Sequence, residues 1–246
     1  MSVINSGTNS LNTKKKSNPL IDLLISIIIP SLILMNLSGK ESLGTTYALL
    51  AALSFPFFYG LYELVVYKKF NLISILGIIN VLLTGGIGIM ELEPKWLAIK
   101  EAAIPLIIGL VVLGSMKTKK PLVKTILYNP SIINTEFVDR VMEEKQTKNE
   151  FELRLKKASY LLSGTFFFSA TLNYILATMI VSSPAGSEAF NEELGRLTLV
   201  SYPVIALPSM VIMMGTLFWL IRSVQKLSGL KLEEIIQLPD EQEKTK

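Results

Sequence analysis

Apolar blocks of about twenty residues, separated by short polar segments, restrict the fold of this chain more than any other feature. A bilayer core of about 30 Å is crossed by about 20 helical residues, each of which adds about 1.5 Å. Only 18% of the 246 residues are charged, whereas a soluble domain usually carries about 25%. The chain is therefore predicted to be all-α, a polytopic bundle of transmembrane helices.

Six blocks qualify as membrane spans by their length and their low content of charge. They are residues 20–37, 45–66, 70–90, 96–116, 158–181 and 197–221. Spans one to three and spans four to six run in opposite directions, and this allows a 3+3 inverted arrangement.

The same blocks divide the chain into a membrane domain and two tails. Residues 1–18 are expected to be a disordered cytoplasmic tail. Residues 19–227 form the six-span domain, which includes an amphipathic cytoplasmic loop at 117–157. Residues 228–246 follow as a second cytoplasmic tail.

Basic residues outside the spans alternate strictly from one side to the other. From the N-terminus, the successive segments contain 3, 1, 2, 1, 10, 1 and 5 lysines and arginines. Short cytoplasmic loops carry the excess of Lys and Arg in membrane proteins. Both termini and the long loop are therefore expected to face the cytoplasm.

The loop at 117–157 has its own helical pattern. Thr135 is expected to cap a helix, and apolar residues recur after it at helical spacing, namely Phe137, Val138, Val141 and Met142. One interpretation is a helix lying on the inner leaflet. The other is a docking surface for a cytoplasmic partner. Four lysines near the start of the loop are taken as charge that faces lipid headgroups, Lys117, Lys119, Lys120 and Lys124.

Polar side chains within the spans are informative because hydrocarbon penalises them. Lys100 and Glu101 lie near the outer end of span four. Adjacent positions on a helix point about 100° apart, so these two are not expected to pair with each other. Asn80, Thr84 and Asn173 are expected at similar depths. Together the five residues outline either a polar site in the outer half of the bundle or interhelical hydrogen bonds that hold the helices together.

Small residues and prolines in the spans admit two interpretations each. The run 84–88 in span three contains three glycines, which favour close helix packing or a ligand-binding break. Four prolines are expected near mid-membrane, Pro30, Pro56, Pro105 and Pro208. Prolines at one level suit a transporter with a central site, and they also occur in helices that only pack.

The missing residue types exclude most enzymatic chemistry. The chain contains no histidine and no cysteine, so thiol nucleophiles, Cys/His metal sites and the usual general base are absent. No catalytic residue, cofactor or metal is predicted, and the protein is not expected to be an enzyme. The distribution of basic residues is explained by membrane topology, so nucleic acid is not expected as a partner.

Several sequence segments of this chain, taken together, carry a resemblance to known membrane proteins. They include Gly85-Gly86, the spacing from Pro94-Lys95-Trp96 to Lys100, the sequence Lys-Pro-Leu-Val at 120–123, and the loop "SSPAGSEAFNEELGRLT". In these segments the chain resembles a family of uncharacterised bacterial integral membrane proteins that is related to the intracellular septation protein A group. The resemblance implies a protein of the bacterial inner membrane with a role in envelope maintenance or division, and it supplies no catalytic residues.

Two functions follow from these observations. The first is a non-enzymatic inner-membrane protein that acts in the cell envelope or in septation, with the lipid bilayer and envelope or division proteins as partners, the latter through residues 117–157. Self-association into a homo-oligomer is compatible with it. The alternative is a small secondary transporter or channel that uses the polar residues of the outer half of the bundle.

Overall fold

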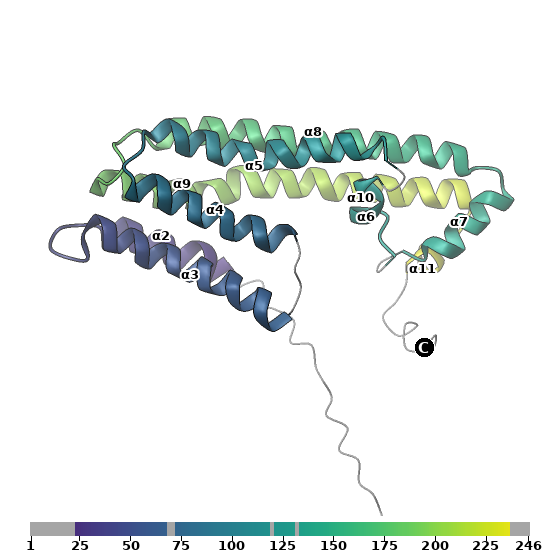
Figure 1. The fold of residues 1–246 in the computed structure, drawn as a ribbon. Coiled ribbons are helices and arrows are strands. Elements are labelled where there is room, and N and C mark those ends of the chain that lie inside the picture. Colours follow the sequence, from purple (N-terminus) through teal and green to yellow (C-terminus); the bar gives the residue numbers. More distant parts are fainter. Residues whose placement is uncertain (1–22, 68–71, 119–120, 131–132, 237–246) are drawn as a thin grey trace, which may run out of the picture.

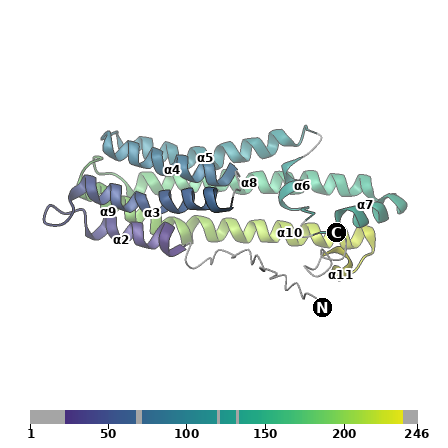
Figure 2. The same ribbon diagram turned by 60° about the horizontal axis from the view of Figure 1, so that its bottom comes forward.

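A computed structural model describes residues 23–67, 72–118, 121–130 and 133–236, except for the side chains of residues 63, 64, 66, 67 and 72–74. The helices form an elongated bundle, with the longest ones side by side along its axis (Figures 1 and 2). The tail predicted at 1–18, the first residues of span one and the last ten residues lie outside the described ranges.

Helices make up all of the described regular structure apart from an isolated bridge between Ile133 and Ile236. The first three helices are α2 (Ile29–Asn36), α3 (Gly44–Tyr67) and α4 (Leu72–Ile89). Four longer or consecutive helices follow, α5 (Pro94–Ser115), α8 (Lys148–Ile180), α9 (Glu188–Ser201) and α10 (Leu207–Ser228). Three short helices lie at one end, α6 (Leu122–Ile126), α7 (Thr135–Glu144) and α11 (Leu232–Ile235).

Four helices are long and apolar enough to cross a membrane: α3, α5, α8 and the continuous helix from α9 to α10. Two shorter apolar helices, Leu24–Asn36 and Ile75–Ile89, correspond to predicted spans one and three. The 33 residues of α8 and the 41 residues of α9–α10 extend for about 50 and 60 Å, far beyond a bilayer core. If these helices cross a bilayer, their charged ends extend beyond its hydrocarbon core.

Prolines act in two different ways in these helices. A π-helical turn, Leu24–Ile28, directly precedes Ile29-Pro30, and another, Tyr202–Ala206, directly precedes Leu207-Pro208. Proline lacks an N–H and its ring displaces the carbonyl four residues earlier, and a wider turn accommodates that displacement. Pro56 and Pro105 lie inside α3 and α5, which stay α-helical around them.

The helices separate into two groups that are consecutive in sequence. Helices α2, α3 and α4 pack in that order, while α8 packs against both α5 and α10. Helix α9 connects the groups because it lies against α2. An inverted symmetry between the two groups stays a prediction.

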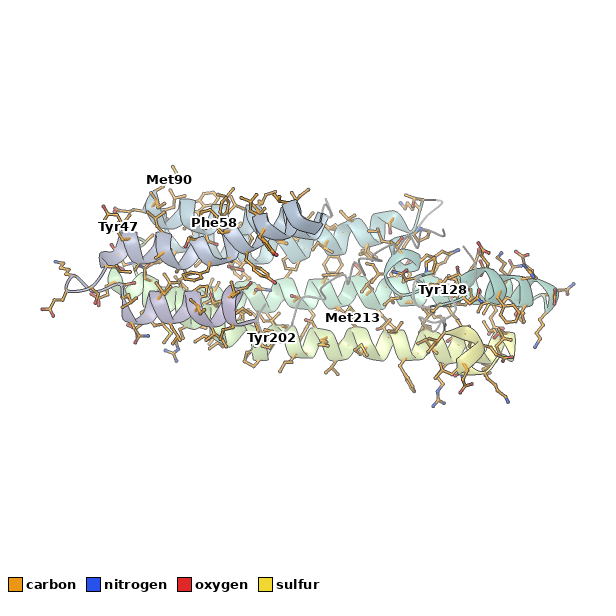
Figure 3. The ribbon with its side chains drawn as sticks, turned by 90° about the horizontal axis from the view of Figure 1, so that it is seen from below. Tyr47, Phe58, Met90, Tyr128, Tyr202 and Met213 are labelled. Carbon is orange, nitrogen blue, oxygen red and sulfur yellow. The ribbon has the colours of Figure 1, made fainter. Side chains whose placement is uncertain are left out.

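Buried side chains gather in two cores, one at each end of the bundle. One core, called the outer core after the predicted orientation, lies where α2, α3, α4, the start of α5 and α9 meet and includes Phe190 and Leu97. The inner core lies around the ends of α8 and α10 and includes Phe151 and Leu220. Between them, most of α10 from Leu207 to Gly215 is exposed. Apolar side chains point outward along the bundle, and Figure 3 labels five of them, Tyr47, Phe58, Met90, Tyr202 and Met213.

Glycines allow the closest helix contacts. A Cβ atom on Gly195 of α9 would lie 2.9 Å from the backbone oxygen of Ser31 and 2.8 Å from Met35 Cγ in α2. In span three, Gly85 and Gly88 face Leu53 and Leu49 of α3, and α4 continues through them as a helix. Of the two interpretations of this glycine run, packing is therefore confirmed.

The predicted helix in the loop at 117–157 is present as α7, with two differences. Its N-cap is Asn134, whose side chain accepts from the N–H of Phe137, and Thr135 is the first helical residue. Val138 and Met142 are fully buried in the inner core. These two residues thus face α8, α10 and α11 instead of lipid, while Phe137 of the same predicted face is exposed. Whether α7 also lies on the inner leaflet stays a prediction.

The contact at Gly195 yields a stability prediction. Gly195→Ala should lower the free energy of unfolding by about 1–3 kcal/mol, because the Ser31 carbonyl belongs to a helix backbone and cannot move independently. The midpoint of thermal unfolding in detergent micelles measures the effect. Gly215→Ala is the matched control on the same continuous helix, since its Cβ would meet open space and alanine favours helix. Equal midpoints for the two variants would contradict the contact.

Candidate intramembrane polar site

Lys100 lies near the outer end of α5 and is buried among helices. Its ammonium donates to Thr84 Oγ1 of α4 at 2.8 Å and to Glu101 Oε1 at 2.6 Å. The Lys100 side chain is 5% exposed and that of Glu101 is 25% exposed. The ion pair therefore lies inside the bundle, with its carboxylate toward the periphery.

The pairing of Lys100 with Glu101 contradicts the sequence-based expectation that these neighbours do not pair. The angular argument considers only where the two side chains leave the helix. Lysine has a flexible four-carbon stem, so its ammonium reaches around the helix to the next residue. The partner of Glu101 is thus on its own helix, and the link to another helix is made by Lys100 through Thr84.

Two further residues were predicted for this site. Asn80 is linked to the Lys100–Thr84 contact, and Asn173 is not. Thr84 donates to the backbone oxygen of Asn80 at 2.9 Å, one turn earlier in α4. The Oδ1 atom of Asn80 is buried and has no hydrogen-bond partner among the described residues. Asn173 donates to the backbone oxygen and the hydroxyl of Ser169, on its own helix. The structure therefore joins Lys100, Glu101 and Thr84 through their side chains and Asn80 through its backbone oxygen, whereas Asn173 bonds within its own helix.

The arrangement is suited to holding α4 against α5. A buried charge is costly unless it is paired and hydrogen-bonded, and here the cation has both a carboxylate and a hydroxyl partner. The two helices are joined by only the short link at 90–93, so the side-chain contact fixes how they cross. Within the described ranges, no three acidic residues are grouped so that they could hold a metal ion.

A second polar network, at the outer end, was missed by the sequence analysis. Asn191 of α9 donates to the hydroxyl of Ser38 and to the backbone oxygen of Thr45. The Glu193 carboxylate accepts from the backbone N–H groups of Ser182 (3.0 Å) and Ser183 (2.9 Å) and from both of their hydroxyls. Two of the predicted outer loops are thus tied to α9.

A signal for this network exists in the sequence. Ser187 precedes Glu188 and an apolar Phe190, which is the pattern of a helix N-cap. Ser187 does cap α9 by accepting from the N–H of Phe190. Starting the helix directly after this cap, at Glu188 and nine residues before the predicted span six, would have placed Asn191 and Glu193 on a helix rather than in a loop.

Comparisons with models of protein families, with curated proteins and with solved structures found no match to this chain. The function is therefore argued from the helices, polar contacts and surfaces described here.

The ion pair generates a second stability prediction. Lys100→Met should lower the free energy of unfolding by about 1–3 kcal/mol, because it leaves Glu101 without its cation and Thr84 without its donor. Glu101→Gln in the Lys100→Met background should restore part of that loss, since the unpaired charge is removed. Thermal unfolding of the two single variants and the double variant measures the coupling. Strictly additive effects would show that the two side chains act independently.

Proposed function

We propose that this chain is a six-span, non-enzymatic protein of the bacterial inner membrane that holds a cytoplasmic partner in envelope or septum assembly. The observation that carries the proposal is a folded module at one end of the bundle, built from α6, α7, α11 and the first turns of α8, which is fastened to α10. The resemblance in sequence to the family related to septation protein A supports the same cellular role.

Contacts between loops support the proposed six-span topology. The side chain of Glu188 in α9 lies against Gly39 in the first outer turn, with 3.1 Å between its Oε1 and the position of a glycine Cβ. The side chain of Glu91 in the α4–α5 link likewise lies against Gly186. The turns after α2, α4 and α8 therefore meet at one end, as alternating spans require. Most of the basic residues that the structure describes, namely those from Lys117 to Lys157 and from Arg222 to Lys231, lie toward the other end.

Side chains of the inner module hydrogen-bond to backbone oxygens at the end of α10, and these bonds hold the module against the long helices. Lys145 donates to the backbone oxygen of Ser228, and Thr147 donates to that of Leu227 at 3.1 Å. Carbonyl groups at a helix C-terminus lack partners within the helix, so these bonds complete the end of α10. Asn134 N–H also donates to the backbone oxygen of Ile235, which joins α7 to α11. A partner bound here would thus be coupled to the long helices.

The exposed surface of the inner module has the composition of a protein-docking surface. Its charged residues are of both signs, and they include Glu136, Arg140 and Glu144. Exposed apolar side chains lie among them, namely Ile126, Phe137, Leu153 and Leu232. Outside the membrane such side chains gain from burial against a protein, at about 25 cal/mol for each Å² of apolar surface covered.

Substitutions on this surface test the proposed role. Phe137→Asp combined with Leu153→Asp should abolish crosslinking of a photo-reactive residue at Asn149 to its partner, because both positions are exposed and the change opposes burial. The same variant should alter cell length or envelope integrity in the source bacterium. The matched control places two aspartates at Lys40 and Ser42, in the exposed turn at the opposite end. Loss of function in the control alone would contradict a partner at the inner module.

The topology is tested by cysteine labelling, which has no background because the natural chain lacks cysteine. Ser42→Cys should react with a membrane-impermeant maleimide added to intact spheroplasts. Asn149→Cys and Lys69→Cys should react only after the membrane is permeabilised. Labelling of Lys69→Cys in intact spheroplasts would exclude six spans with cytoplasmic ends.

A small transporter or channel is the second candidate, and it is favoured by the buried Oδ1 of Asn80, which has no partner among the described residues and lies one helical turn before Thr84, the residue that binds Lys100. A buried polar atom without a partner is expected where a substrate or water supplies one. Glu101→Gln separates the two functions in the cellular assay. Loss of function in this variant, with the protein still folded in the membrane and the module variant unaffected, would replace the first proposal by the second.

A further inference from the structure

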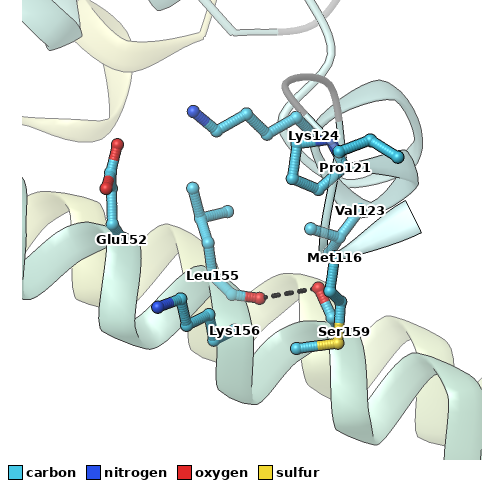
Figure 4. Close-up of a pocket in the computed structure, with 9 residues that line it drawn as sticks. Met116, Pro121, Val123, Lys124, Glu152, Leu155, Lys156 and Ser159 are labelled. Atoms are coloured by element: carbon cyan, nitrogen blue, oxygen red, sulfur yellow. Dashed lines mark hydrogen bonds between the residues drawn. The ribbon is translucent and has the colours of Figure 1, made fainter. Parts of the chain in front are cut away.

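A pocket of about 190 Å³ opens where the end of α5, the short helix α6 and the first part of α8 meet (Figure 4). Apolar side chains form part of its wall, namely Met116, Pro121, Val123 and Leu155. The remaining lining residues are polar or charged, namely Thr118, Lys124, Glu152, Lys156 and Ser159.

The position of the pocket along the helices places it at the membrane surface, given the proposed topology. Met116 directly follows the last residue of α5. Ser159 is the second residue of the charge-free stretch of α8 that begins at Ala158. Both helices thus pass from hydrocarbon into the headgroup layer at this level. A ligand in the pocket lies beside the phosphates of the inner leaflet.

The charged side chains that line the pocket favour an anionic ligand. The side-chain ammonium groups of Lys124 and Lys156 form no ion pair and no hydrogen bond with any residue of the described ranges. Figure 4 shows their side chains on opposite sides of the opening, with the carboxylate of Glu152 at its rim. Among the lining residues that the structure describes, two ammonium groups and one carboxylate leave one net positive charge. That charge matches a single phosphodiester, while Glu152 disfavours ligands with several phosphates.

We propose that this pocket binds the phosphate group of an inner-leaflet phospholipid that carries one net negative charge. The Lys124 and Lys156 ammonium groups donate to the phosphate oxygens. The headgroup hydroxyls donate to the Glu152 carboxylate, and the glycerol end of the acyl chains lies against Met116 and Leu155. The apolar wall selects a lipid over a free phosphate, since a free phosphate has no apolar part to place there. The site rests on the proposed topology only for its placement in the inner leaflet.

Native mass spectrometry of the full chain in detergent tests the proposal with phosphatidylglycerol as the probe. Each basic residue near a membrane surface contributes about a five-fold gain in affinity for anionic lipid. Lys124→Gln combined with Lys156→Gln should therefore weaken the tightest phosphatidylglycerol site about 30-fold. The matched control, Lys157→Gln with Lys226→Gln, removes the same charge from exposed positions outside the pocket and should leave that site unchanged. Arginine at both pocket positions should retain binding.

The remaining comparisons identify the source of the phosphate and the role of the fold. Phosphatidylcholine should bind the natural chain much more weakly than phosphatidylglycerol, and inorganic phosphate or glycerol 3-phosphate at millimolar concentration should not displace the lipid. Equal loss in the pocket and control variants would overturn the proposal, as would displacement by inorganic phosphate. The thermal midpoint without added lipid should be the same for all variants, because both pocket lysines reach solvent. The assay contains no partner protein, so its failure is distinct from failure of the docking proposal.

Discussion

The structure depends on two helices that are much longer than a bilayer is thick. Because α8 and the helix from α9 to α10 extend for about 50 and 60 Å, neither can lie within a hydrocarbon core of about 30 Å along its whole length. Their projecting ends provide the surfaces on which both cores are built. The outer end of α9 organises α2, α3 and α4, and the inner ends of α8 and α10 organise α7 and α11.

Polar side chains in this protein mostly satisfy backbone groups where helices end or loops turn. Lys145 and Thr147 complete the C-terminus of α10, and Glu193 accepts from two loop N–H groups. The Lys100–Thr84 contact acts between two helix interiors instead. In hydrocarbon, an unsatisfied backbone or side-chain group costs several kcal/mol. The same contacts therefore set both the stability and the relative positions of the helices.

Sequence reasoning predicted the helical membrane class and the position of each apolar block, because hydrophobic length is a local property. It placed the starts of α8 and α9 too late, since a helix continues into water when no residue interrupts it. It identified α7 from the spacing of Val138 and Met142 but assigned their apolar face to lipid. Apolar spacing alone cannot distinguish lipid from protein as the covering surface. The Lys100–Glu101 pair and the Asn191 contacts depend on side-chain reach and tertiary placement, which sequence spacing does not contain.

The concentration of packing at the two ends has a mechanical consequence. A bundle resists bending where its helices are bonded to one another, and it is compliant where they are flanked only by solvent or lipid. Between Leu207 and Gly215, most residues of α10 are exposed, and a π-helical turn immediately precedes that stretch. Flexing of the molecule should therefore concentrate at this level. A change in bilayer thickness or curvature would tilt one end of the bundle relative to the other while leaving each core intact.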